Sequence, residues 1–226
     1  MEKTELKRVT RNRKEAESTY NKISRWYDIL EGYWERKAIK IALQKLNAAD
    51  GDFVLEIGFG TGHGITALAD SVGITGKVFG LDLSANMIKR TKLRLKNLGL
   101  DNRTILYRGD AVSIPFKENS FDAIFMSFAL ELFDNPEIPK VLKGCFSTLK
   151  DKGRICVASL TNAGKKSVMR ELYVYGHDKF PKLLDCRPIY VKESLIEAGF
   201  KILDTSQVSL LGIPVEIVLA KKMLGQ

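Results

Sequence analysis

The chain has 226 residues, of which 45 % are hydrophobic, and its formal net charge at pH 7 is +9. The length suits one domain with one hydrophobic core, and the apolar runs stop well short of the roughly 20 residues of a membrane-spanning helix. The positive charge allows a nucleic-acid partner, but the basic side chains of the first 17 residues are mixed with four glutamates, a pattern typical of a solvated surface.

The N-terminal segment starts at Met1–Lys7 without the apolar stretch of a signal peptide, so we expect a cytoplasmic location. A helix is predicted around Ser18–Asp28. Its Tyr20 and Tyr27 share one face, which packing on the rest of the domain would explain. We expect residues 1–48 to form an N-terminal helical extension or cap.

The first predicted strand, Phe53–Ile57, is an apolar run of the kind that fills the centre of a parallel sheet, and it carries one acid, Glu56. Three glycines follow it, at Gly58, Gly60 and Gly62. They let the chain turn tightly and leave bare backbone for a ligand. A helix from about Gly64 to Ser71 would point unpaired N–H groups at a carboxylate or phosphate above the turn.

The spacing of these glycines separates several classes of site. A dinucleotide-binding fingerprint would need a small residue at His63 or Ile65, and a phosphate-binding P-loop would need a lysine that Gly62–Gly64 lacks. A glycine turn without any ligand stays open. An acid followed by Gly-x-Gly-x-Gly resembles motif I of the Rossmann-like methyltransferases that depend on S-adenosylmethionine (SAM).

The second predicted strand, Lys77–Asp82, also ends on an acid. An acid at this place, some 25 residues beyond the first strand, can accept both ribose hydroxyls of a nucleoside. A surface or capping role for Asp82 is the alternative. Ser84 is predicted to cap a helix that Gly99 ends.

The third predicted strand, Thr104–Tyr107, leads into Asp110 and Ala111, and a Pro-Phe loop and a Ser-Phe-Asp entry precede the fourth strand, Ile124–Ser127. SAM-dependent methyltransferases show the same order of motifs. The apolar face of a helix from Ile138 to Leu149 is expected to cover the sheet.

The C-terminal part continues this pattern with a fifth strand, Arg154–Ser159, a helix from about Val191 to Gly199, and two further strands, Phe200–Leu203 and Val215–Leu219. The segment from about 160 to 190 is longer than an ordinary connection, which favours a substrate cap.

The cysteines form no Cys-x-x-Cys pair, so no zinc site is predicted. Cys145 and Cys156 are interpreted as core residues, and Cys186 has no assigned role.

The resemblance implies a doubly wound α/β fold. We expect a mostly parallel seven-stranded sheet with helices on both faces and an antiparallel last strand, and the family places the last two strands as an antiparallel pair at one edge. Residues 49–226 would form this SAM-binding domain, with the substrate cap inserted in it.

The resemblance also implies SAM as the cofactor and assigns roles to single residues. Glu56 would lie at the mouth of the first strand near the ammonium group of SAM, Asp82 would bind the ribose hydroxyls, and Leu83 would lie beside the adenine. Asp110 and Ala111 would flank the adenine edge, and Ser127 would face the methionine part. The glycines would allow close approach.

The predicted N-terminal helix is similar to the Tyr…Tyr-Asp helix of the ubiquinone/menaquinone-biosynthesis type of methyltransferase, whose tyrosine closes over the cofactor. The resemblance assigns this role to Tyr27. It also favours a small-molecule or lipid-like acceptor such as a quinone precursor. The segments Ser159–Asn162 and Asp185–Pro188, however, depart from the pattern expected of the quinone enzymes.

The chemistry of methyl transfer requires no catalytic triad, because the sulfonium of SAM is already an activated electrophile. A base is needed only if the acceptor atom must lose a proton. The candidates are Glu131, Asp134, His63 and His177. A cap, loop or surface role explains each of them, so no residue is assigned as catalytic.

Two other functions stay open. One is an RNA or protein methyltransferase that uses the basic surface, with an activator subunit or as a homodimer. It is not favoured, since Ser127–Leu130 lacks the Asn/Asp-Pro-Pro-Tyr/Phe motif of many such enzymes. The other is a module that binds SAM without catalysis.

Overall fold

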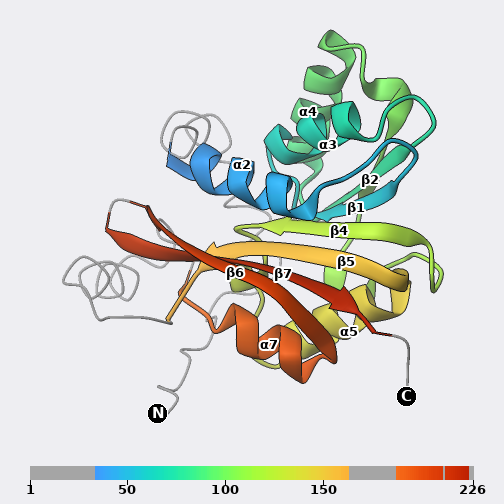
Figure 1. The fold of residues 1–226 in the computed structure, drawn as a ribbon. Helices are drawn as coiled ribbons and strands as arrows, with labels where there is room; N and C mark the ends of the chain where they lie inside the picture. Colours follow the sequence, from blue (N-terminus) through green and yellow to red (C-terminus); the bar gives the residue numbers. More distant parts are fainter. Residues whose placement is uncertain (1–33, 163–186, 211, 224–226) are drawn as a thin grey trace.

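A seven-stranded sheet forms the centre of the computed structural model, which describes residues 34–162, 187–210 and 212–223. The strands lie in the order β3-β2-β1-β4-β5-β7-β6 (Figure 1). Their bounds are β1 Phe53–Ile57, β2 Lys77–Asp82, β3 Thr104–Arg108, β4 Phe121–Ser127, β5 Leu149–Leu160, β6 Phe200–Leu210 and β7 Ile213–Lys222. β7 runs antiparallel to both of its neighbours, β5 and β6, and the other pairs of neighbouring strands are parallel. The predicted sheet is confirmed, including the antiparallel pair at its edge.

Helices cover both faces of the sheet, as predicted (Figure 1). One face carries α2 Trp34–Leu46, α3 His63–Ser71 and α4 Ala85–Asn97, and the other carries α5 Ile138–Thr148 and α7 Val191–Glu197. Short 3-10 turns are η1 Asp101–Arg103, η2 Ala111–Ser113 and η3 Leu130–Leu132. Among the residues with a described position, no helix combines the length and the apolar character needed to span a membrane.

The central strands supply two hydrophobic cores, because successive side chains point to opposite faces. Leu55 and Ile124 pack in the core beneath α5, whereas Val54 and Phe125 pack in the core beneath α2 and α3. Strands buried on both faces need apolar residues throughout. Glu56 is the exception in β1, where it is 1 % exposed.

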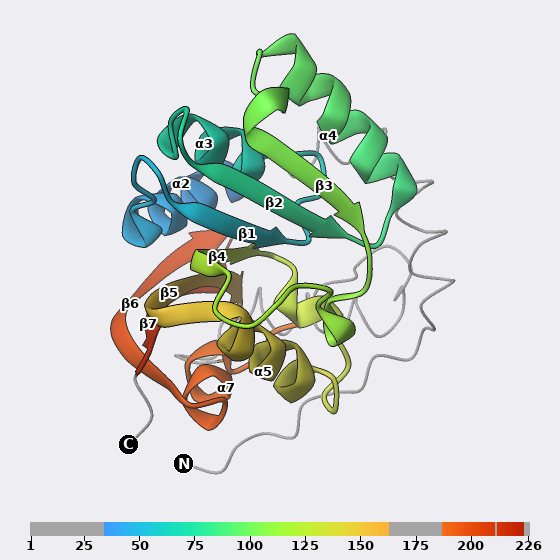
Figure 2. The ribbon, with the colours of Figure 1, turned by 90° about the vertical axis from the view of Figure 1, so that its right-hand side faces the viewer.

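The carboxyl ends of β1, β2 and β3 meet at one edge of the sheet (Figure 2). β1 pairs with β2 on one side and with β4 on the other, so the order of the strands reverses between β1 and β4. In open α/β sheets, ligands bind outside the carboxyl ends of the strands at such a switch point. The fold therefore places the glycine turn after β1 where a ligand is expected.

Some strands are longer than predicted. β4 begins at Phe121, β5 covers Leu149–Leu160, and β6 continues to Leu210. The second half of β6 is mostly exposed and rich in polar side chains, such as Asp204 and Thr205. Backbone pairing with β7 holds it as a strand although its sequence lacks an apolar run.

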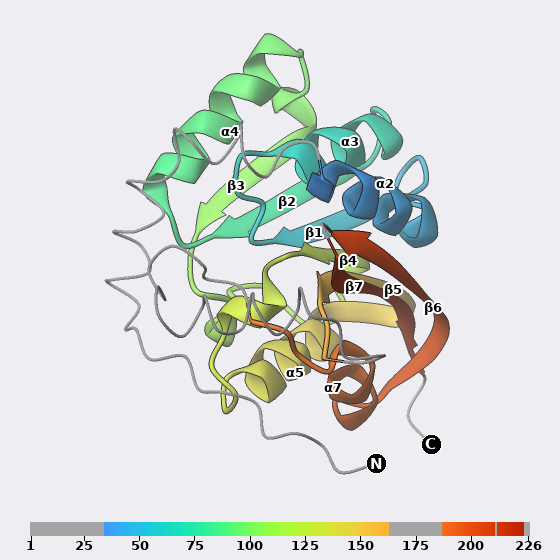
Figure 3. The same ribbon diagram turned by 90° about the vertical axis from the view of Figure 1, so that its left-hand side faces the viewer.

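The predicted N-terminal cap is described only from residue 34 onward. Its α2 lies beside α3 (Figure 3) and buries Ala38, Ala42 and Leu46 in the same core. Tyr27, His177 and Cys186 lie outside the described residues, as does most of the 160–190 segment. The division of the chain at residue 48 stays a prediction.

The two described cysteines confirm their interpretation as core residues. Cys145 of α5 and Cys156 of β5 are fully buried and form no disulfide. Burial raises the pKa of each thiol to about 12, so neither is a thiolate at neutral pH.

Candidate active site

The glycine turn after β1 is wedged between two other parts of the chain. Gly58 and Gly62 have φ angles of 70° and 88°, in the left-handed region that favours glycine. A Cβ atom on Gly58 would lie 2.6 Å from Cβ of Ala129, and one on Gly62 would lie 2.7 Å from Cγ2 of Thr91. Above Gly60, no heavy atom of the described residues lies within 4 Å of the position that a Cβ would take. The turn thus has fixed sides and an open top where a ligand can approach backbone.

Asp82 ties this turn to the end of β2. Its Oδ2 accepts a hydrogen bond from Gly60 N–H at 2.9 Å, and its Oδ1 accepts one from Ser84 N–H at 2.8 Å. Thr91 donates to the Gly60 carbonyl at 2.9 Å. Burial raises the pKa of Asp82, although these backbone N–H groups and that of Leu83 counteract it. An ionised carboxylate has about four acceptor sites, so Asp82 keeps a lone pair that can accept a ribose hydroxyl.

Glu56 lies deeper than the sequence predicts, beneath the first turn of α3. A Cβ on Gly64 would clash with its Oε1, and its buried Oε2 has no hydrogen-bond partner among the described residues. Burial, and secondly the charge of Asp82, raises the pKa of Glu56 well above its usual range. An approaching cation would lower that pKa and supply a partner for the carboxylate.

The remaining predicted contacts lie around the same edge. Asp110 accepts a hydrogen bond from Val112 N–H at 2.9 Å and so caps η2, in which Ala111 is buried. Gly109 N–H donates to the Asp82 carbonyl at 3.0 Å, which brings the loop after β3 against the end of β2. Leu83 and Ser127, at the ends of β2 and β4, are partly exposed.

The candidate residues therefore gather at one edge of the sheet, apart from Tyr27, which lies outside the described part of the chain.

A buried polar cluster lies beyond the end of β4. Glu131 of η3 is 0 % exposed, and its Oε1 accepts a hydrogen bond from Leu160 N–H at 3.3 Å. Burial raises the pKa of Glu131 to about 7, against the opposing effects of its own N–H, the Ser159 hydroxyl, Leu160 N–H and the charge of Arg187. Arg187 is 4 % exposed and donates to the Phe133 carbonyl at 2.6 Å.

Glu35 of α2 interacts electrostatically with Glu131 of this cluster. Burial and the charge of Glu131 raise the pKa of Glu35 to about 8. At the β7 side of the cluster, Thr161 donates a hydrogen bond to Glu216 at 3.3 Å. Sequence reasoning considered Glu131 among the bases but missed Glu35 and Arg187. The unmatched Asp185–Pro188 segment was the one signal that pointed to Arg187.

Local structural roles explain two other candidate bases. Asp134 lies just before α5, and its Oδ1 accepts a hydrogen bond from Asn135 N–H at 2.9 Å. His63 begins α3, with its Nδ1 3.1 Å from Nη1 of Arg94. Across residues 34–162, 187–210 and 212–223, no cluster of three or more His, Cys, Asp or Glu side chains could hold a metal ion.

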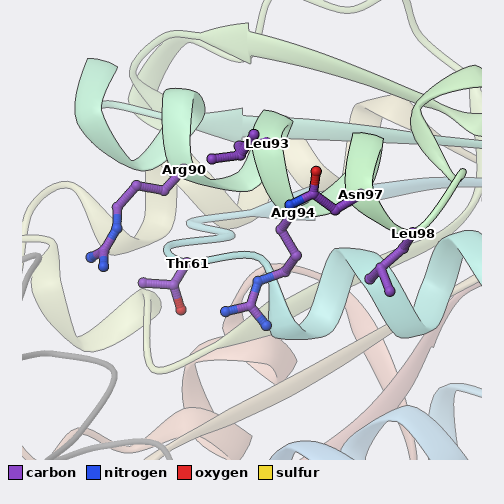
Figure 4. A pocket seen from close by; sticks show the side chains of 6 residues that line it. All are labelled: Thr61, Arg90, Leu93, Arg94, Asn97 and Leu98. Atoms are coloured by element: carbon purple, nitrogen blue, oxygen red, sulfur yellow. The ribbon is translucent and has the colours of Figure 1, made fainter.

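A surface groove of about 440 Å³ runs between the glycine turn and α4. Its lining consists of Thr61, Arg90, Leu93, Arg94, Asn97 and Leu98 (Figure 4). Neither Glu56, Asp82 nor Asp110 lines it, so this groove is distinct from the predicted cofactor cradle. Two arginines on its wall suit an anionic group.

Sequence comparisons identify a family. Residues 54–153 match the model of a family described as a methyltransferase domain. The chain is 32 % identical over 160 residues to the demethylmenaquinone methyltransferase of Geobacillus kaustophilus, covering 69 % of this chain and 67 % of that enzyme. It is also 32 % identical over 139 residues to the enzyme of that name from Oceanobacillus iheyensis, covering 62 % of this chain but only 57 % of that enzyme. Several such relatives are thus matched over less than two thirds of their length.

A structural comparison agrees in fold. A methyltransferase solved in complex with the Haloferax volcanii Trm112 activator superposes with a TM-score of 0.72 at 18 % identity, covering 92 % of this chain and 99 % of that one. At such low identity the likeness concerns the fold alone.

Proposed function

Because this chain belongs to the class I SAM-dependent methyltransferases, in the group that includes the demethylmenaquinone methyltransferases, we propose that it transfers a methyl group from SAM to a quinone-like acceptor. The acceptor is a small or lipid-like aromatic molecule. Bound SAM supplies a methyl group on a sulfonium. The protein has to orient the acceptor behind that methyl group and exclude water, and positioning of this kind contributes about 7 to 11 kcal/mol.

The observation that carries the proposal is the fit of the cradle to SAM. The open backbone above Gly60 suits the nucleoside of SAM, and Asp82 offers a lone pair to the ribose. The Oε2 of Glu56, which has no hydrogen-bond partner among the described residues, suits the ammonium of the methionine part. Asp110 and Ala111 lie at the adjoining strand end, where the adenine edge is expected. Tyr27 as a residue that closes over the cofactor stays a prediction from the resemblance.

The acceptor class rests on the relatives, since the matched enzymes are named for demethylmenaquinone. The test is to incubate the purified protein with SAM and a reduced demethylnaphthoquinone and to read the product by mass spectrometry. We expect a product heavier by one CH₂ unit together with S-adenosylhomocysteine. Tight SAM binding with no transfer to any quinol would contradict the proposed acceptor and favour a module that binds SAM without catalysis.

A basic surface supports one second candidate, an RNA methyltransferase. α4 carries five basic residues and no acidic one, and two of them, Arg90 and Arg94, line the groove beside the glycine turn. Lysine and arginine contacts to phosphates give binding that weakens steeply with salt. Filter binding of tRNA at two salt concentrations separates the candidates: saturable binding, with methyl transfer to RNA, would replace the quinone hypothesis.

Partner and location are further proposals. An activator subunit is one hypothesis, supported by the fold shared with the Trm112-bound methyltransferase. A cytoplasmic location remains what the sequence predicts.

A further inference from the structure

Buried polar side chains of the described residues concentrate at the carboxyl end of β5. Glu131, Ser159, Thr161, Arg187 and Glu216 are each at most 4 % exposed. Ser159 pairs with Glu216 in the β5–β7 register, and Thr161 donates to Glu216. Leu160, between Ser159 and Thr161, donates to Glu131. Burying so many polar side chains costs free energy unless each of them is hydrogen-bonded, ion-paired or in contact with a ligand.

The turn that carries Glu131 touches the glycine turn. Ala129 lies against Gly58, where an added Cβ would come within 2.6 Å of the Ala129 Cβ. Phe128, just before it, has a φ of 51° and donates its N–H to the Ala158 carbonyl at 2.8 Å. Non-glycine residues held in the left-handed region gather at functional sites. Glu131 therefore follows, by two residues, the contact between this turn and the cofactor cradle.

Arg187 is fixed beside Glu131 by backbone contacts of the segment that follows it. Ile189 N–H donates to the Leu160 carbonyl at 3.0 Å, and Asn162 N–H donates to the Ile189 carbonyl at 3.0 Å. The Asn162 side chain donates to the Pro188 carbonyl at 3.1 Å. These contacts hold Arg187 at the end of β5, and its charge acts on Glu131.

One carboxylate oxygen of the cluster has no hydrogen-bond partner among the described residues. Oε2 of Glu131 is buried and makes no hydrogen bond to any described residue. A buried carboxylate oxygen normally finds a donor, so its missing partner is a sign of a ligand group. This oxygen belongs to the turn whose Ala129 lies against Gly58 of the glycine turn.

We propose that Glu131 is the proton acceptor for a hydroxyl group on an aromatic acceptor, an inference that rests on the methyl transfer proposed above. Arg187 positions the Glu131 carboxylate and favours its ionised form. Of the two, Glu131 contacts the acceptor hydroxyl through Oε2. Arg187 acts on the carboxylate and is a positioning residue.

The step balances for an aromatic alcohol methylated on the carbon beside its hydroxyl. The O–H bond breaks, its proton goes to Glu131, and the electron pair, delocalised through the ring, forms the bond from the ring carbon to the methyl carbon. The methyl–sulfur bond breaks, and its electrons stay on sulfur. The ring carbon then releases its own proton to water, and Glu131 returns its proton to the oxygen, which restores the aromatic alcohol.

The groups that face Glu131 set its titration near neutral pH. These are Glu35 from α2, Ser159 and the Leu160 N–H from β5, and Arg187 from the segment beside it. Burial raises the pKa of Glu131 to about 7, and a base with a pKa near the working pH is well matched to proton transfer. The rate of transfer is then expected to rise with pH as the carboxyl ionises.

The test compares Glu131→Gln and Arg187→Lys with Asp122→Asn, a matched carboxyl-to-amide change at the opposite end of β4, outside the cluster. In full-length protein with SAM and a quinol, we expect Glu131→Gln to lower kcat about a hundredfold or more and to remove its rise with pH. Arg187→Lys should shift the pH profile of kcat and lower kcat less than Glu131→Gln does. SAM affinity should change by no more than about twofold in all three, and kcat of Asp122→Asn by no more than about threefold.

A second readout is independent of turnover. With S-adenosylhomocysteine bound, a phenol whose absorbance reports its ionisation should ionise at lower pH on the wild-type protein than on Glu131→Gln. Equal ionisation on both proteins, or a Glu131→Gln variant that keeps kcat and its pH profile, would overturn the inference. If the wild-type protein binds SAM but transfers to no quinol, the proposed function fails, and the phenol titration alone then decides the role of Glu131.

Discussion

At the scale of single residues, Asp82 orders the glycine turn and is proposed to bind the ribose of SAM. The sequence predicts a ribose contact from its place at the end of a strand, and in the structure it also holds the Gly60 and Ser84 N–H groups. The same carboxylate orders the glycine turn and is expected to accept the ribose hydroxyls. The shape of the cradle and its affinity for SAM therefore depend on one residue. Replacing it removes both.

We therefore expect Asp82→Ala to weaken SAM binding at least tenfold, or about 1.4 kcal/mol, as measured by isothermal titration calorimetry. Asp101→Ala, which changes an exposed acid of η1, is the control and should bind SAM like the wild-type protein. Unchanged affinity in Asp82→Ala would refute the assignment.

The raised pKa of Glu131 makes the stability of the folded protein depend on pH. The pKa of its carboxyl rises from 4.5 to about 7 on folding, so between these values the folded protein keeps a proton that the unfolded chain has lost. The unfolding free energy must then fall as pH rises through this window, by on the order of 3 kcal/mol. Below pH 4.5 the contribution is fully present, and above about 7 it is lost.

Glu131→Gln should abolish that part of the fall, because glutamine does not titrate. Urea denaturation at several values between pH 5 and 8 on the two proteins measures the difference. Parallel stability curves for wild type and Glu131→Gln would show that this carboxyl has an ordinary pKa in the folded protein.

The limits of sequence reasoning are clearest at this residue. Glu56 and Asp82 were identified because each is an acid on an apolar strand, a local pattern. Glu131 lies in the short turn η3, where no apolar strand pattern marks it, and its neighbours Glu35 and Arg187 are far away in the chain. Their encounter depends on how α2 and the segment after residue 186 pack on β4 and β5, which spacing along the chain does not encode.

At the scale of elements, an arginine of β5 holds the C-terminal end of α2 against the sheet. Arg154 donates to the Leu46 carbonyl and the Asn47 carbonyl at 2.5 and 2.6 Å, and it pairs with Asp52 at 2.8 Å. Carbonyls at the end of a helix have no partner within it, so a cation there both bonds them and complements the helix dipole. α2 in turn carries Glu35 toward Glu131.

Arg154→Ala should therefore destabilise the protein by about 1 to 3 kcal/mol, because it leaves these carbonyls without a charged donor. Lys92→Ala, an exposed change on α4, is the control. Thermal unfolding measures both, and equal melting temperatures for the two variants would contradict the role assigned to Arg154.

The elements themselves were largely predictable. The apolar runs of β1, β2 and β4 and the cap at Ser84 gave the central strands and α4, and the structure confirms them. The extent of β6 was wrong, since its polar second half is held by pairing with β7. Local sequence predicts buried strands well and edge strands poorly, because an edge strand needs fewer apolar side chains.

At the scale of the whole molecule, the sheet order brings four chain segments that are far apart in sequence to one edge. The glycine turn, the end of β2, the start of η2 and the turn before η3 meet where the strand order reverses. In the arrangement proposed above, the methyl donor and the acceptor lie on either side of the turn between β4 and η3. The same fold serves many reactions, so the acceptor has to be argued from the side chains at this edge.

The most direct measurement of the central claim is a structure of the protein with SAM or S-adenosylhomocysteine bound. The account predicts the nucleoside above Gly60, its ribose on Asp82, its adenine beside Asp110, and its ammonium near Glu56. Density for the ligand in the groove of Arg90 and Arg94, or a cradle left empty while another nucleotide fills it, would contradict the account.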